Sequence, residues 1–121
     1  MNRNRTIRYY RNLGGEDLCA CDSCQRWRKK IRDAYPKAAH YLDSLGADIA
    51  KPHEVWAVEY DDEGTLMYMD AQYVIFGNKD EFSECAIGDI KIRLAKSYPP
   101  TGIKEEHYVM EMDPFFLKAD H

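Results

Sequence analysis

The chain of 121 residues has no long hydrophobic run. None of its apolar stretches approaches the roughly 18–20 residues that a transmembrane helix requires. Residues 1–15 are rich in arginine and lack the apolar core of a secretory signal. We therefore expect a cytoplasmic protein that makes no use of a membrane and whose thiols stay reduced.

Sequence motifs of the common enzyme classes are also missing. The chain has no Gly-x-Ser-x-Gly turn, no glycine-rich phosphate loop and no His-Glu-x-x-His motif. Its histidines are scattered, although His107 has carboxylates near it in sequence. We expect a protein that is not an enzyme. A small hydrolase or redox enzyme built around Cys21, Cys24 or His107 is the weaker alternative.

Charge is unevenly distributed along the chain. Residues 1–37 hold ten Lys and Arg against four Asp and Glu, whereas residues 38–121 hold seven against seventeen, so net charges of +6 and −10 give −4. Such a division either steers a partner or binds the basic segment to its own acidic body. Because no repeat or linker interrupts the chain, we expect residues 1–121 to form one domain. Residues 1–18 are expected to be an extended basic arm that ends in a turn at Gly14-Gly15.

Hydrophobic spacing predicts two short helices after this arm. Cys24, Trp27 and Ile31 lie three and four residues apart, on one face of a helix. Pro36 suits the first turn of a second helix, and Gly46 stands where a left-handed C-terminal cap is expected.

Beyond residue 50 the pattern changes from helical spacing to alternation, which is typical of strands. The segments with this pattern are 54–60, 65–76, 90–94 and 107–112, and residues 115–117 are expected to pack back onto the core. The predicted fold class is therefore α+β, with two short N-terminal helices packed on a mainly antiparallel sheet of four or five strands.

Three of the four cysteines, Cys19, Cys21 and Cys24, lie within six residues directly before the first predicted helix. Thiols at this spacing form a common zinc half-site, because a tight turn brings the sulfurs to one ion. The fourth ligand would come from one of three residues: Cys85, His40 or His53.

The same cysteines have a purely structural interpretation. Cys24 shares its helical face with Trp27 and Ile31, and a free cysteine in such a position is often buried. We favour the core for Cys24 and keep a zinc cofactor as the alternative. Cys21 and Cys24 also have the spacing of a redox pair, but the residues before them do not form the strand that normally precedes one.

Acidic and aromatic side chains are the candidates for partner binding. Three carboxylates lie in or beside the predicted hairpin turn, at Glu59, Asp61 and Asp62. Three strand tyrosines are expected to be exposed, namely Tyr68, Tyr73 and Tyr108. We predict a non-enzymatic protein-binding module, of the kind that neutralises a toxin or holds a partner. The alternative is a zinc-stabilised nucleic-acid module that uses the arm and first helix, although a pI near 5.5 makes nucleic acid the less favoured partner.

Two resemblances add to this interpretation. Residues 34–46, together with residues 21–24, resemble a group of small uncharacterised bacterial single-domain proteins, and residues 72–77 and 101–107 fit the same pattern. The Cys-x-Cys-x2-Cys of residues 19–24 is similar to that of late-competence-type zinc proteins, which implies a zinc site.

Overall fold

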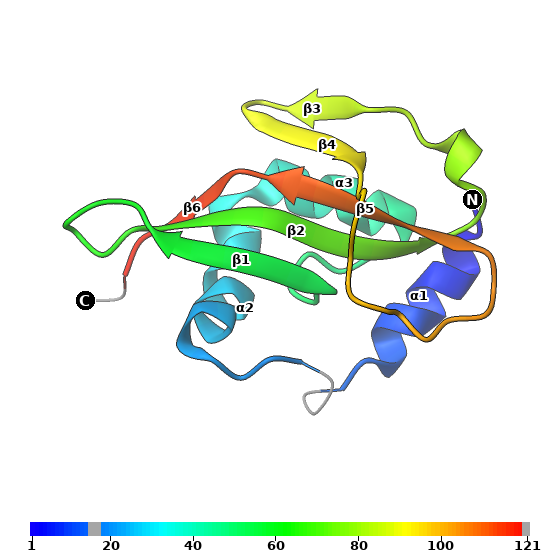
Figure 1. Cartoon of the computed structure of the whole chain (residues 1–121), viewed down its shortest axis with the longest axis horizontal. Helices are drawn as coiled ribbons and strands as arrows, with labels where there is room; N and C mark the ends of the chain where they lie inside the picture. The colour runs from blue at the N-terminus through cyan, green and yellow to red at the C-terminus, as the bar shows by residue number, and fades with distance from the viewer. Residues whose placement is uncertain (15–17, 120–121) are drawn as a thin grey trace.

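The computed structural model describes residues 1–14 and 18–119, which form three α-helices and a six-stranded antiparallel sheet (Figure 1). The helices are α1 (Arg3–Asn12), α2 (Asp22–Ala34), α3 (Pro36–Leu45) and the short 3-10 helix η2 (Lys79–Glu81). The strands are β1 (Glu54–Glu59), β2 (Leu66–Phe76), β3 (Cys85–Ile87), β4 (Ile90–Leu94), β5 (His107–Asp113) and β6 (Phe115–Leu117). The α+β class is confirmed. The expected two helices and four or five strands are too few, since α1 and the short strands were not foreseen.

Strand β2 is the centre of the sheet. The strand order is β1-β2-β5-β4-β3, and β6 pairs with β2 as well. β5 lies along the second half of β2, with Tyr73 opposite Met110, while β6 lies along the first half, with Tyr68 opposite Phe115. Between the halves the β1–β2 register shifts and Asp70 adopts a φ of +52°. Over this stretch β2 contains one residue more than β1. The additional residue reverses the side-chain alternation along β2, so that Tyr68 and Tyr73 both face the helices.

Trp27 joins α2 to the sheet. Its side chain is 1% exposed, and its ring centroid lies 4.9 Å from that of Tyr68 and 5.0 Å from that of Phe115. The indole Nε1 donates a hydrogen bond of 2.8 Å to the carbonyl oxygen of Ile49. All three helices contribute residues to the core on this face (Figure 1). Among the described residues, none of the helices combines the length and apolarity required for crossing a membrane.

The expected extended arm is wrong for residues 3–12, which form α1. Thr6 and Tyr10, one helical turn apart, are buried against the end of β2. The hydroxyl of Tyr10 donates to the carbonyl of Val74 at 3.0 Å, and the hydroxyl of Thr6 accepts from the backbone N–H of Phe76 at 3.1 Å. The contacts of Thr6 and Tyr10 with the distant strand β2 explain why a polar sequence is helical here. Only half of the turn expected at Gly14-Gly15 can be compared, because residue 15 lies outside the described residues.

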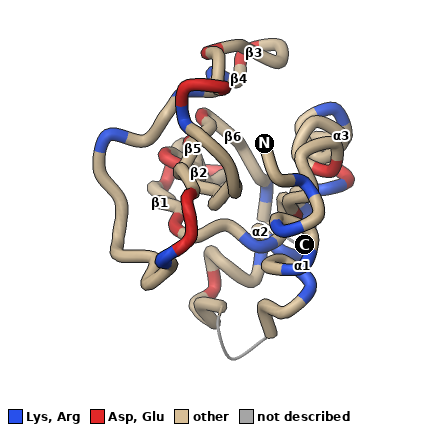
Figure 2. The backbone as a smooth tube through the Cα atoms, turned by 90° about the vertical axis from the view of Figure 1, so that its right-hand side faces the viewer, with Lys and Arg blue, Asp and Glu red and all other residues tan. Residues whose placement is uncertain are grey.

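Arginines of the basic segment contact the acidic body of the same chain. The guanidinium of Arg5 lies 2.7 Å from a carboxylate oxygen of Glu105, and Arg32 lies 3.0 and 3.1 Å from carboxylates of Asp43 and Asp48. Figure 2 shows basic residues along the helices and acidic residues along the sheet and its turns. Of the two roles that the charge division allowed, these contacts support the binding of the segment to its own body.

Gly46 provides a test of how closely α1 packs on α3. Its φ is +87°, and a Cβ added there would lie 2.8 Å from the carbonyl oxygen of Arg3 and 2.9 Å from Cγ1 of Ile7. We expect Gly46→Ala to lower the free energy of unfolding by about 2 kcal/mol or more, through backbone strain and displacement of α1. Gly88→Ala is the matched control. Gly88 also has a positive φ, +59°, but no atom lies within 4 Å of its added Cβ. Urea denaturation of both variants measures the difference, and equal losses would contradict the close packing.

Candidate metal centre

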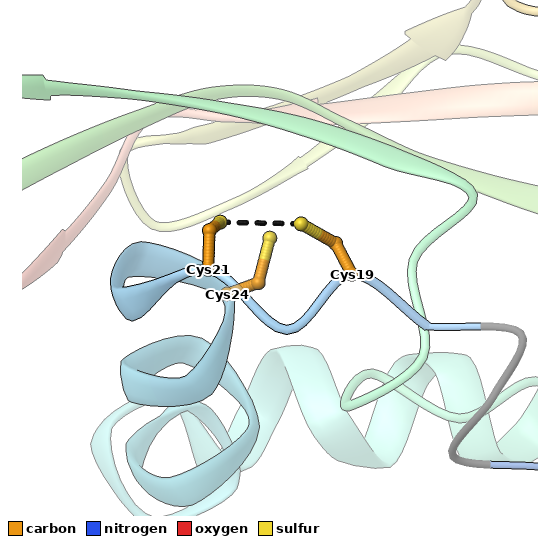
Figure 3. A group of neighbouring side chains, drawn as sticks. All are labelled: Cys19, Cys21 and Cys24. Atoms are coloured by element: carbon orange, nitrogen blue, oxygen red, sulfur yellow. Dashed lines mark hydrogen bonds between the residues drawn. The ribbon is translucent and has the colours of Figure 1, made fainter.

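Three thiols meet where the chain enters α2 (Figure 3). Cys21 is the N-cap residue, with the extended dihedral angles φ −67° and ψ 162°, and Cys24 follows in the first turn of the helix. The sulfur atoms of Cys19, Cys21 and Cys24 all lie within 4.8 Å of one another. The thiol of Cys19 donates a hydrogen bond of 3.2 Å to the sulfur of Cys21. The spacing in the sequence therefore produces the cluster that it predicted.

Side chains of α2 hold the segment that carries the first two cysteines. Arg28 donates from Nη1 to the carbonyl oxygen of Cys19 at 2.6 Å, and Gln25 donates from Nε2 to that of Ala20 at 2.6 Å. The segment before the helix is thus bound to the helix that follows it. A cluster held in this way loses less conformational entropy when it binds a ligand than a free loop would.

Two of the thiols, those of Cys21 and Cys24, differ in their affinity for protons. The pKa of Cys21 is lowered to about 6, chiefly by the hydrogen bond with the Ser23 hydroxyl at 3.4 Å and then by the one from Cys19. The pKa of Cys24 is raised to about 12, chiefly by partial burial and then by its hydrogen bonds with Cys21 and Cys19. At neutral pH Cys21 is therefore a thiolate, while Cys24 keeps its proton.

A small cavity of about 70 Å³ lies beside the cluster, between α2 and the chain that leads into β1. Cys19 and Cys24 line one side of it, and His53 lines the other. The Nε2 atom of His53 lies 2.7 Å from the carbonyl oxygen of Pro99 and must carry the proton of this hydrogen bond. In a neutral ring Nδ1 then has the lone pair. His53 therefore shares the cavity with Cys19 and Cys24, although its ring nitrogens do not belong to the group of mutually close ligand atoms.

Cys85 does not join the other cysteines. It lies on β3, at the opposite edge of the sheet from β1, and its thiol donates to the hydroxyl of Tyr41 at 3.9 Å. Among the described residues, the group of mutually close metal ligands contains none of the three candidates for the fourth ligand, Cys85, His40 and His53. The expectation that Cys85 completes a four-sulfur set is wrong, because the topology places β3 far from α2.

The core position that we favoured for Cys24 is also incorrect in part. Its side chain is half-buried, but its sulfur lies among the other two thiols (Figure 3). Trp27, one turn further along α2, belongs to the hydrophobic core, whereas Cys24 is not among the residues packed in it. Cys24 therefore combines a partly buried position with a place in the cluster.

The tyrosines expected to be exposed are instead buried. Tyr68 and Tyr73 are 0% exposed and Tyr108 is 7% exposed. The hydroxyl of Tyr68 donates to the carbonyl of Ser23 at 2.7 Å, and that of Tyr73 donates to the carbonyl of Ile49 at 2.7 Å. All three belong to the core between helices and sheet. The hydroxyls of Tyr68 and Tyr73 satisfy backbone groups and all three rings are buried, so a partner would have to contact other residues.

The predicted carboxylates do lie on the surface of the hairpin. Glu59, Asp61 and Asp62 are exposed. The side chain of Asp61 accepts hydrogen bonds of 3.0 Å from the backbone N–H groups of Glu63 and Thr65, and these bonds lower its pKa. Asp61 therefore fixes the turn, while Glu59 and Asp62 remain available on the surface.

The cluster has two chemical uses. Three soft thiolates that converge on one point suit a metal such as zinc. A low pKa at Cys21 beside a high pKa at Cys24 also suits thiol–disulfide exchange. Exchange would use only the sulfurs of Cys21 and Cys24, and Cys19 would contribute the hydrogen bond that helps to lower the pKa of Cys21. Comparison with protein-family models, curated proteins and solved structures found no match for the chain.

Alkylation of Cys21 should follow its pKa. We expect the rate of reaction with iodoacetamide, measured at this residue by peptide mass spectrometry, to rise with a midpoint near pH 6. Ser23→Ala removes the principal hydrogen bond to the thiolate and should move the midpoint upwards. Cys85→Ser, which removes an exposed thiol outside the cluster, should leave it unchanged. A midpoint near the ordinary cysteine pKa, about 8.5, would show that the cluster does not stabilise the thiolate.

Proposed function

We propose that the protein binds a zinc ion through Cys19, Cys21 and Cys24. The observation that supports this proposal is the mutual approach of all three sulfurs to within 4.8 Å. Zinc–thiolate bonds of about 2.3 Å in tetrahedral geometry separate the sulfurs by about 3.8 Å, so small side-chain rotations would suffice. The ion would then bind the segment before α2 to the helix itself, which is a structural role.

We assign the fourth position to His53. A Cys3His set is a common structural zinc site with no coordination position left open. The hydrogen bond between His53 Nε2 and the Pro99 carbonyl is of the kind that orients zinc-bound histidines and leaves Nδ1 as the ligand atom. Because His53 directly precedes β1, the ion would join α2 to the first strand of the sheet.

Metal analysis of protein purified without added metal tests the site. We expect about one zinc per chain, which each of Cys19→Ser, Cys21→Ser and Cys24→Ser removes and Cys85→Ser retains. His53→Ala should weaken binding by about tenfold or more. Protein that contains no zinc, and that takes up none when it is reduced and titrated, would refute the proposal.

Zinc binding should be strongly pH-dependent. Cys21 is already a thiolate at neutral pH, whereas coordination by Cys24 would displace the proton that its raised pKa retains. The affinity should therefore fall steeply as the pH is lowered below neutrality. Competition with a zinc chelator across this range measures the slope, and an affinity that does not change with pH would contradict coordination by thiols.

A second function, the binding of a partner protein, is favoured by the distribution of exposed apolar side chains. Trp56, Val58 and Tyr60 are all exposed and lie on or next to one strand, β1. Co-purification with the products of neighbouring genes tests this function, and a partner that binds stably would support it. Salt-sensitive binding of the zinc-loaded protein to nucleic acid would instead support the nucleic-acid alternative.

A further inference from the structure

The face of the sheet opposite the helices is only half covered. The segment between β4 and β5 crosses one end of this face, where Ile103 packs against the buried Val74 and Val109 (Figure 1). The other end is formed by β1, the first half of β2 and β6. No described segment crosses it. This end of the sheet presents side chains directly to solvent.

An apolar row occupies the uncovered end. Val55 and Ala57 of β1 pack towards the helices, so the alternating residues Trp56 and Val58 point to the opposite face. Trp56 is 66% exposed, Val58 43% and Tyr60 59%. Cross-strand partners and a ring contact extend this surface, which we call the apolar row: Trp56, Val58, Tyr60, Met67, Met69 and Phe116.

Strand β1 also has an unpaired edge. Among the described strands it pairs only with β2. The backbone N–H of Tyr60 donates to the carbonyl of Thr65 at 2.9 Å, so the alternation of an antiparallel ladder turns Val58 towards β2. The backbone N–H and C=O groups of Ala57 and Glu59 are consequently directed away from the sheet. A further strand could pair there.

The surroundings of the apolar row are acidic. Glu54 and Asp70 line a recess together with Trp56, and the exposed hairpin carboxylates Glu59, Asp61, Asp62 and Glu63 lie at and beyond the other end of β1. Arg93 lies on this face, but it contacts the carboxylates of Glu111, Asp113 and Asp70 at 2.8, 2.8 and 3.1 Å. Arg26 lies beside the hairpin and donates to the carbonyl of Gly64 at 2.9 Å. Carboxylates thus outnumber the basic side chains, and the surface attracts positive charge.

A recess at the start of β1 is suited to one basic side chain. Trp56 and the 41% exposed Tyr98 line it together with Glu54 and Asp70. Gln72, which also lines it, is 4% exposed, and its Oε1 accepts no hydrogen bond from the described residues. Two aromatic rings, two carboxylates and an unsatisfied acceptor are the groups that bind a guanidinium or an ammonium.

We propose that β1 receives an extended, basic segment of a partner protein. The segment pairs with the free edge at Ala57 and Glu59 and places apolar side chains beside the apolar row. A Lys or Arg enters the recess between Trp56 and Tyr98. This inference rests on the proposed partner-binding function and is independent of the zinc site.

Selection from a phage-displayed library of random peptides about nine residues long, a typical strand length, identifies the sequences that bind. We expect peptides with apolar residues at alternate positions and at least one Lys or Arg. Binding of a selected synthetic peptide should shift the fluorescence of Trp56, since the only other tryptophan, Trp27, is buried. The affinity should fall as salt is added.

Two variants separate the edge from the apolar row. Ala57→Pro removes an N–H that points away from β2, and Trp56→Ala removes an exposed ring. Each should weaken peptide binding by about tenfold or more while the circular dichroism spectrum stays unchanged. Ala86→Pro is the matched control on the opposite edge. The two-residue turn after β3 pairs Ile87 with Ile90, so the N–H of Ala86 also points outwards. The Ala86→Pro variant should therefore bind the peptide as tightly as the unaltered protein does.

Other results would overturn the inference. Recovery of no binding peptide, selection of peptides without basic residues, or affinities unaffected by both Ala57→Pro and Trp56→Ala would each do so. A dimer that Ala57→Pro dissociates in sedimentation analysis would make a second copy of this chain the occupant. A gene-neighbour partner that still binds the Ala57→Pro and Trp56→Ala variants would leave the partner-binding function intact and remove only this surface.

Discussion

Packing of the Trp27 indole links the fold to the thiol cluster. The ring lies between Tyr68 and Phe115, its N–H binds the Ile49 carbonyl, and one side of it lines the cavity beside the cysteines. Since α2 carries Trp27 and begins at the cysteines, the direction of its first turn depends on this core contact. Replacing a buried tryptophan by alanine costs about 3–5 kcal/mol, a large part of a domain's typical 5–15 kcal/mol. The proposed zinc site is therefore positioned by the core and not by the loop alone.

Local patterns in the sequence predicted the elements that depend on local physics. The spacing of Trp27 and Ile31 gave α2 its amphipathic face, and alternation revealed the long strands. Helix α1 escaped prediction because its buried residues, Thr6 and Tyr10, are held by bonds to the distant strand β2. Strands β3 and β6 have three residues each, which is too short for a clear alternating pattern.

The candidate site also has some features that local sequence patterns predict and others that depend on distant segments. The grouping of Cys19, Cys21 and Cys24 follows from their spacing and could be predicted, whereas the position of Cys85 depends on strand order. The burial of Tyr68 and Tyr73 also could not be predicted. They are an odd number of residues apart, and only the irregularity at Asp70 brings both to the helical face. Errors in the prediction thus lie where distant segments or a shifted register decide the outcome.

The uncovered edge of β1 also has a consequence for the protein on its own. An unpaired strand with apolar side chains can pair with the same strand of another molecule, and proteins commonly prevent this with charge. The carboxylates around the hairpin and the net charge of −4 provide such repulsion near neutral pH. Towards the isoelectric point near pH 5.5 the net charge falls to zero, so the long-range part of that repulsion disappears while the edge remains. The same acidic residues that would attract a basic partner therefore also govern the colloidal stability of the free protein.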